Sequence, residues 1–194
     1  MTEPPKPRRR QWSEGTRSTL LEAGARAFAE QGFDQLTEDG IARTVGLTRG
    51  ALQYQFGDKR GLFTEVFARM LGDLVVLLSD QTMEKAHSVA EVGAGMELFF
   101  TLSTEPERRR VLLVDGPAVL GWDPWRIALR TAFAPLLHHA FGHWAQAGLI
   151  GEDEIAGHAE LILGASVHAA LADDAGDPAP RRALEAMLRR LSGG

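Results

Sequence analysis

Apolar residues recur along this chain at the three- and four-residue spacing of amphipathic helices, and no segment alternates as a strand does. The clearest stripe predicts a long helix from about Lys59 to Asp80. An earlier stripe predicts a helix from about 16 to 31, which Gly32 would end because glycine readily adopts the positive φ of a helix C-terminus. The pattern therefore favours an all-α fold.

Further helical patterns fill most of the remaining sequence. Breaks that contain glycine or proline separate them, and Pro117 and Pro135 lie inside the patterns, where proline kinks or resets a helix. The predicted helices cover residues 87–103, 105–120, 123–147, 152–172 and 179–192. With two short helices between 36 and 59, the sequence predicts an all-α protein of about nine helices.

The segment from Leu36 to Lys59 predicts two short helices joined by a tight turn. Ile41 and Val45 lie one turn apart, Gly46 permits the positive φ at which the chain leaves a helix, and Thr48 suits the start of the next helix. Such a corner is typical of a DNA-binding helix-turn-helix, whose second helix enters the major groove. The same corner also occurs in all-α proteins that bind no DNA.

The side chains on the outer face of the second short helix match the chemistry of base edges. Arginine pairs with O6 and N7 of guanine, and glutamine pairs with adenine in the same two-pronged way. Threonine at a helix start and lysine suit phosphate contacts. The residues expected to contact DNA are Thr37, Thr48, Arg49, Gly50, Gln53, Tyr54, Gln55 and Lys59.

The net charge of −5 is unevenly distributed. Residues 1–60 contain ten Lys or Arg and eight Asp or Glu, whereas the remainder contains eleven and eighteen. Because DNA binding depends on local neutralisation of phosphates, the overall negative charge does not exclude a DNA partner. The first twelve residues, with three prolines and Arg8, Arg9 and Arg10, predict a disordered basic arm. This arm is either a solubilising tail or a segment that enters the minor groove.

The composition is that of a soluble globular protein, with 44% hydrophobic and 24% charged residues. The sequence contains no cysteine, which excludes disulfides and thiolate chemistry and favours a reducing compartment. No apolar run approaches the ~18 residues of a membrane span, and the N-terminus lacks the apolar stretch of a signal peptide. We therefore expect a cytoplasmic protein with no membrane partner.

The stretch from Thr16 to Met70 resembles the N-terminal signature of the TetR family of transcriptional regulators. The matching residues are Thr16–Arg17, Gly32–Phe33, Ile41–Ala42, Gly46–Leu47, Gly50, Leu52, Phe56, Lys59 and Leu62–Phe63. The sequence departs from the family at Gln53, where the family usually has Tyr, and at Gln55, where it usually has His. In the family those two positions commonly contact phosphates, so we expect weaker contacts here. The resemblance implies a helix-turn-helix domain over residues 13–58, after the arm of residues 1–12.

The resemblance also implies that residues 59–194 form an effector-binding and dimerisation domain. The segment Val111–Trp122 resembles a C-terminal pattern of one branch of these regulators. Many small residues in the helix at about 152–172, together with an apolar stripe in the helix at 179–192, favour a homodimer built through these two helices. A palindromic operator independently requires two DNA-binding heads one helical turn apart.

An unidentified small-molecule effector is expected to bind among the helices from about 62 to 147. Each residue that is a candidate for contact with the effector is also a plausible core residue. The candidates are Phe67, Met70, Met96, Phe99, Phe100, Asp115, Trp122, Trp125 and Phe133. Asp115 lies in an apolar run, and a buried carboxylate needs a partner, which Arg126 or Arg130 could supply.

We expect neither enzymatic activity nor a metal or cofactor. His139 and His143 lie one helical turn apart, but neither cysteine nor an HExxH motif accompanies them. The run Gly164–His168 resembles a nucleophile motif, yet no predicted strand precedes it. The favoured interpretation is a sequence-specific transcriptional regulator, a repressor that an effector releases from its operator. The alternative is an all-α enzyme with a purely structural helical corner.

Overall fold

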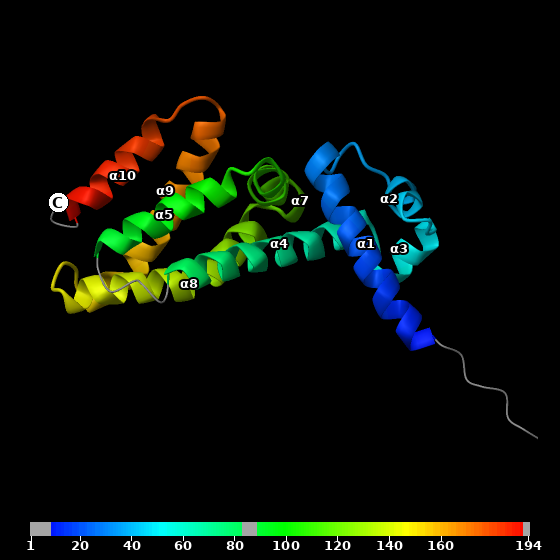
Figure 1. The fold of residues 1–194 in the computed structure, drawn as a ribbon, viewed down its shortest axis with the longest axis horizontal. Coiled ribbons are helices and arrows are strands. Elements are labelled where there is room, and N and C mark those ends of the chain that lie inside the picture. The colour runs from blue at the N-terminus through cyan, green and yellow to red at the C-terminus, as the bar shows by residue number, and fades with distance from the viewer. Residues whose placement is uncertain (1–8, 83–88, 192–194) are drawn as a thin grey trace, which may run out of the picture. The chain divides into compact units, whose positions relative to one another are not determined.

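The computed structural model describes residues 9–82 and 89–191, and the predicted all-α fold is confirmed, because these residues form helices and turns without a strand (Figure 1). The chain divides into two compact units, Met1–Phe67 and Ala68–Gly194. Helix α4 (Lys59–Thr82) belongs to both, so the boundary lies inside this helix and not at 58/59, where the sequence places it.

The first unit contains α1 (Arg9–Gln31), α2 (Glu38–Thr44), α3 (Arg49–Phe56) and the beginning of α4. Its fully buried side chains come from all four helices, at the apolar positions that the sequence pattern singles out: Leu20, Phe28, Ile41, Leu52, Leu62 and Phe63. The ring of Phe63 meets those of Phe28 and Phe33 edge to face, at centroid distances of 5.1 and 5.4 Å. Burial of this aromatic cluster fixes α1 against the start of α4.

Helix α1 begins at Arg9, inside the segment that the sequence assigns to a disordered arm. Residues 1–8, which include Arg8 and the three prolines of that arm, lie outside the described residues. The expectation that residues 9–12 are disordered is therefore wrong, because no proline interrupts the chain after Pro7 and the helix extends back to Arg9.

The second unit contains the remainder of α4 and the helices that follow. Helices α5, α8, α9 and α10 pack against one another, and α10 lies along α9 (Figure 1). The bounds are α5 (Val89–Ser103), α6 (Pro106–Arg108), η1 (Arg109–Asp115, a π-helix), α7 (Gly116–Leu120), α8 (Trp122–Gln146), η2 (Glu152–Glu154, a 3₁₀ turn), α9 (Ile155–Asp174) and α10 (Ala179–Leu191).

The segment predicted as one helix over 105–120 consists of α6, the π-helix η1 and α7. Pro117 has no N–H, so it cannot donate the i→i−5 bond of a π-helix to the carbonyl of Leu112. The indole Nε1 of Trp125 donates to that carbonyl at 2.7 Å instead. Pro117 thus resets the helix as predicted, whereas Pro135 lies within α8 and does not end it.

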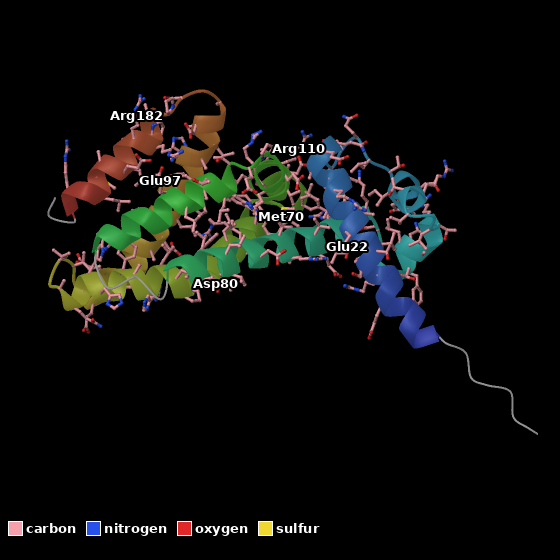
Figure 2. All side chains as sticks on the ribbon, viewed as in Figure 1. Glu22, Met70, Asp80, Glu97, Arg110 and Arg182 are labelled. Atoms are coloured by element: carbon pink, nitrogen blue, oxygen red, sulfur yellow. The ribbon has the colours of Figure 1, made fainter. Side chains whose placement is uncertain are left out.

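Arg181 of α10 connects three helices of the second unit. Its guanidinium donates to Glu97 of α5 at 2.7 Å, to Asp173 of α9 at 3.2 Å and to Glu185 of α10 at 2.9 Å. The same group lies 4.9 Å from the ring centroid of Phe100, in a cation–π contact. Glu97 is labelled on α5 in Figure 2. This network positions α5 against α9 and α10.

Helix α9 exposes apolar surface. Over Glu152–Asp173 the chain is long and apolar enough to cross a membrane by length and composition alone, with a mean hydropathy of 1.3 and 33% of the window buried. Charged and polar residues interrupt this segment, so it contains no long uninterrupted apolar run. Leu161 on this helix is 74% exposed. Exposed apolar surface of this kind is typical of a face that packs against another protein or a lipid.

Candidate nucleic-acid interface

Threonine side chains begin both helices of the corner. The Oγ1 of Thr37 accepts a hydrogen bond from the N–H of Gly40 at 3.1 Å, and the Oγ1 of Thr48 accepts one from the N–H of Ala51 at 3.2 Å. Both residues are therefore N-caps, which confirms the predicted cap at Thr48.

The turn between α2 and α3 is closed by backbone hydrogen bonds around Gly46. The N–H of Leu47 donates to the carbonyl of Ala42 at 2.9 Å, and the N–H of Gly46 donates to Arg43 at 3.1 Å. Gly46 has a φ of +69°, a value that side chains with a Cβ rarely adopt. The predicted glycine turn is confirmed, and it sets the direction in which α3 leaves α2.

Helix α3 buries one face and exposes the other. Leu52 is fully buried and Phe56 is 9% exposed, whereas Tyr54 is 83% exposed. The Arg49 side chain is 63% exposed. Gly50 and Gln53 are also exposed, while Gln55 is only half-exposed. Four of the predicted DNA contacts thus share the outer side of α3, and Gln55 lies apart from them.

Glu38, near the start of α2, joins the two base-reading candidates of α3. Its Oε2 accepts hydrogen bonds from Nε of Arg49 at 2.7 Å and from Nε2 of Gln53 at 3.0 Å. Its Oε1 accepts one from the backbone N–H of Lys59 at 3.2 Å. The hydrogen bond from Arg49, assisted by those from Lys59 and Gln53, lowers the pKa of Glu38 against the effect of desolvation. The carboxylate therefore stays charged at neutral pH.

The sequence places Glu38 in the first turn of a predicted helix but gives no sign of its three partners, Arg49, Gln53 and Lys59. The signal in the sequence that points to Glu38 is its negative charge. A carboxylate on a surface that is expected to meet phosphates needs a compensating hydrogen-bond donor. Which donor it finds depends on the angle between α2 and α3, and a sequence does not show that angle.

Lys59, a predicted phosphate contact, lies at the start of α4 and has hydrogen-bond partners within the protein. Its Nζ donates to the carbonyls of Phe33 and Leu36, both at 2.8 Å, and lies 4.0 Å from the ring centroid of Phe33. The ammonium thus holds the loop between α1 and α2 against the start of α4. A phosphate contact from Lys59 would compete with these two carbonyls.

The candidate effector residues divide into two groups. Phe99, Phe100 and Phe133 are buried, and the ring of Phe99 contacts those of Phe100 and Phe133 at 5.9 and 5.6 Å, so these residues form core. Phe67 is buried and belongs to the first unit, and Met70 is half-buried. The side chain of Met96 lies outside the described residues.

Trp122 and Trp125 line an open cleft between α8 and α9 that has about 560 Å³ of empty space, its mouth included. Trp125 is 4% exposed and Trp122 is 64% exposed, and their rings lie 5.1 Å apart. Arg126, Arg130 and Glu160 line the same cleft. An adjoining groove of about 1130 Å³ continues along α8 and α9.

The expected partner of Asp115 is wrong. Arg110 forms the ion pair, with its Nε 3.7 Å from Oδ2 of Asp115, and it is labelled in Figure 2. Arg126 and Arg130 pair instead with Asp123 at 3.8 Å and Glu160 at 3.0 Å. The π-helix carries Arg110 and Asp115 together, so the pair forms locally and leaves the two arginines of α8 at the cleft.

His139 and His143 are adjacent on α8, with their Nε2 atoms 3.4 Å apart. Among the residues that the structure describes, no group of three or more histidines, cysteines or carboxylates is placed to hold a metal ion. The pair therefore supplies two ligands at most from this chain, and a tetrahedral zinc site requires three or four.

Two family models match the chain. "Bacterial regulatory proteins, tetR family" matches residues 20–66, which span the corner, and "Tetracyclin repressor-like, C-terminal domain" matches residues 89–194.

Individual relatives agree with this result. The "HTH-type transcriptional regulator AcrR" of Shigella flexneri is 28% identical over 55% of this chain and 49% of its own length. The "HTH-type transcriptional repressor AcnR" of Corynebacterium diphtheriae is 33% identical over 47% of this chain and 42% of its own. The chain thus spans about half the length of the curated relatives it matches. A crystal structure of a TetR-family regulator from Pectobacterium atrosepticum is similar over 94% of both chains, with 26% identity and a TM-score of 0.75.

Proposed function

Because this chain belongs to the TetR family of bacterial regulatory proteins, we propose that it is a sequence-specific DNA-binding repressor of transcription. The observation that carries the proposal is the division of α3, which buries Leu52 and Phe56 and exposes Arg49, Gln53 and Tyr54. An eight-residue helix needs no such exposed aromatic residue for its own packing. Relatives that are named as transcriptional repressors support repression, and not activation, of transcription.

In this proposal α3 lies in the major groove of the operator. Arg49 and Gln53 contact base edges, Tyr54 contacts the backbone or a thymine methyl group, and Gly50 allows the helix backbone to approach closely. The N-caps Thr37 and Thr48, together with Gln55, are the proposed phosphate contacts, whereas the ammonium of Lys59 stays on the carbonyls of Phe33 and Leu36. Because bacterial DNA lies in the cytoplasm, we infer that the protein acts there.

The proposed active form is a homodimer built through α9 and α10. The 74% exposure of Leu161 on α9 and the 48% exposure of Met187 on α10 support it, because both are large apolar side chains on the surface of a single chain. Two helices from each protomer would form a four-helix bundle with twofold symmetry. Such a dimer matches a palindromic operator.

The proposed effector site is the cleft of Trp122 and Trp125. Its aromatic wall and charged rim suit a small amphipathic molecule, whereas Phe99, Phe100 and Phe133 pack against one another. The dimer is proposed to have two conformations that differ in their affinity for the operator. An effector that binds one conformation more tightly than the other changes the operator affinity by a coupling free energy of about 1–3 kcal/mol. A test is quenching of tryptophan fluorescence by a panel of small aromatic molecules, with Trp122→Ala as the variant that should lose it.

Selection of DNA sites from a random duplex library tests the repressor proposal. The wild-type protein should enrich a palindromic site, and Arg49→Ala with Tyr54→Ala should lower affinity for that site by tenfold or more. Arg26→Ala removes an exposed cation of α1 and is the matched control, which should bind nearly as the wild type does. Failure of the wild type to enrich any sequence would reject the proposal in favour of a structural corner.

A further inference from the structure

We propose that Glu38 determines which bases α3 recognises, by fixing the orientation of Arg49 and Gln53 before DNA is bound. This inference rests on the proposed function. One carboxylate oxygen of Glu38 accepts from Nε of Arg49 at 2.7 Å and from Nε2 of Gln53 at 3.0 Å, so two exposed side chains of α3 share a single anchor.

Glu38 is itself held rigidly. Its side chain is 16% exposed, and its second oxygen accepts from the backbone N–H of Lys59, at the start of α4. It lies directly after Thr37, the N-cap that fixes the start of α2. An anchor tied to two helices holds its partners in position at a lower entropic cost on binding than two free side chains would have.

The bond to Glu38 decides which edge of Arg49 remains for DNA. With Nε directed at the carboxylate, the two terminal Nη groups stay available, and together they form the fork that matches O6 and N7 of guanine. The side chain of Arg49 is 63% exposed, so this fork can reach a base. Arg49 is therefore assigned to guanine.

The same carboxylate fixes the direction of the Gln53 amide. A charged carboxylate only accepts hydrogen bonds, so Gln53 must turn its NH₂ group towards Glu38. One N–H donates to Glu38, which leaves the second N–H and the amide oxygen as the donor and acceptor that match N7 and N6 of adenine. Gln53 is therefore assigned to adenine.

The spacing of Arg49 and Gln53 constrains the operator. The two residues are four positions apart on α3, so they lie about one helical turn, or about 6 Å, apart along it. Because stacked base pairs are about 3.4 Å apart, each half-site should contain a guanine and an adenine one or two base pairs from each other. A family-typical tyrosine at position 53 could not make this amide contact.

A carboxylate on this surface also repels DNA phosphates. Loss of Glu38 should therefore raise affinity for DNA of random sequence while it relaxes discrimination among bases, and these opposite changes distinguish a positioning residue from a merely structural one. The lowered pKa of Glu38 agrees with a carboxylate that stays charged during binding.

The test is binding-site selection followed by titration of every single-base change in the selected site. Glu38→Ala should reduce discrimination about tenfold at the guanine and adenine positions. Glu38→Gln retains one acceptor oxygen and should give an intermediate result. Asp39→Asn is the control, because it removes the same charge from the next residue, where the carboxylate pairs with Arg43. It should leave base preference unchanged.

The outcomes separate the two proposals. If the wild type selects no sequence, the proposed function is wrong and this inference falls with it. The wild type could select a site while Glu38→Ala and Glu38→Gln lose as much affinity as the wild type does for each single-base change in it. In that case only the proposed role of Glu38 is wrong. Should Glu38→Ala unfold for lack of its bond to Lys59, Glu38→Gln decides, with thermal unfolding showing that it is folded at the assay temperature.

Discussion

A Cβ added at Gly61 would collide with the carbonyl oxygen of Phe56. The chain turns sharply between α3 and α4 here, and the N–H of Gly61 donates to Oδ1 of Asp58 at 2.7 Å. Since the obstructing atom belongs to the backbone, a side chain cannot be accommodated by rotation of a neighbouring rotamer. Helix α3 therefore depends on a glycine outside it for its junction with α4.

Gly61→Ala should lower the free energy of unfolding by about 2 kcal/mol or more, because the backbone of α3 or α4 must move. Gly72→Ala, in the same helix, is the control, since a Cβ there meets nothing within 4 Å. It should be neutral or stabilising by up to about 1 kcal/mol. Urea unfolding of both variants measures the difference, and equal stabilities would contradict the assigned clash.

Lys59→Met should destabilise the protein more than it weakens DNA binding. The substitution removes the donors to the carbonyls of Phe33 and Leu36 while it preserves most of the apolar stem. We expect a loss of about 1–3 kcal/mol. The slope of log affinity against log salt should stay unchanged, whereas loss of a phosphate contact would reduce it by about 1. Such a reduced slope would restore the role that the sequence predicts for Lys59.

Local features of the corner were predictable from sequence. The N-cap at Thr48, the turn at Gly46 and the burial of Leu52 and Phe56 each depend on residues within one or two turns. Helix propensity, caps and apolar periodicity act over that same range, so a sequence pattern carries them directly.

Contacts between distant residues were not predictable. Glu38 meets Arg49 and Gln53, and Lys59 meets Phe33, only because two interhelical angles bring them together. Periodicity also cannot tell which neighbour an apolar face meets. It therefore grouped Phe99, which lies in the core, with Trp122, which lines a cleft.

The contribution of Glu38 to stability should disappear in acid. Its pKa is lowered in the folded state, chiefly by the hydrogen bond from Arg49, so the charged form favours folding above the ordinary glutamate pKa of about 4.3. This contribution is then lost as the pH falls through the lower folded-state value. Thermal unfolding of the wild type and Glu38→Gln should differ at pH 6, and the difference should shrink progressively as the pH falls below about 4.3. If the difference in unfolding temperature between the two proteins stayed constant over this pH range, the charge of Glu38 would be excluded as its cause.

Arg181→Met should loosen α5 from α9 and α10, because it leaves the carboxylates of Glu97, Asp173 and Glu185 without their shared cation. The arginine side chain is 22% exposed, so we expect a loss of about 2 kcal/mol in the free energy of unfolding. Arg182→Met changes the exposed neighbour on the same helix and should cost less than about 0.5 kcal/mol. Chemical denaturation of the pair measures both, and equal losses would show that the network contributes nothing specific.

Leu161→Glu tests whether α9 forms the dimer. In a single chain Leu161 is 74% exposed, so a charged residue there should leave the fold of the protomer intact. At a protein interface the same carboxylate would be buried beside its symmetry mate, where like charges in an apolar environment are strongly unfavourable. We therefore expect sedimentation velocity to show a dimer for the wild type and a monomer for Leu161→Glu at micromolar concentration.

Ile127→Glu is the matched control, because Ile127 is also a large exposed apolar residue, at 46%, but lies on α8. It should remain dimeric. Circular dichroism should show that both variants keep the helical content of the wild type. A Leu161→Glu protein that stays dimeric would move the interface away from this face of α9, and a monomeric Ile127→Glu protein would place it on α8. If the dimer is lost only with Leu161→Glu, operator affinity should fall with it, because a single head contacts only one half-site.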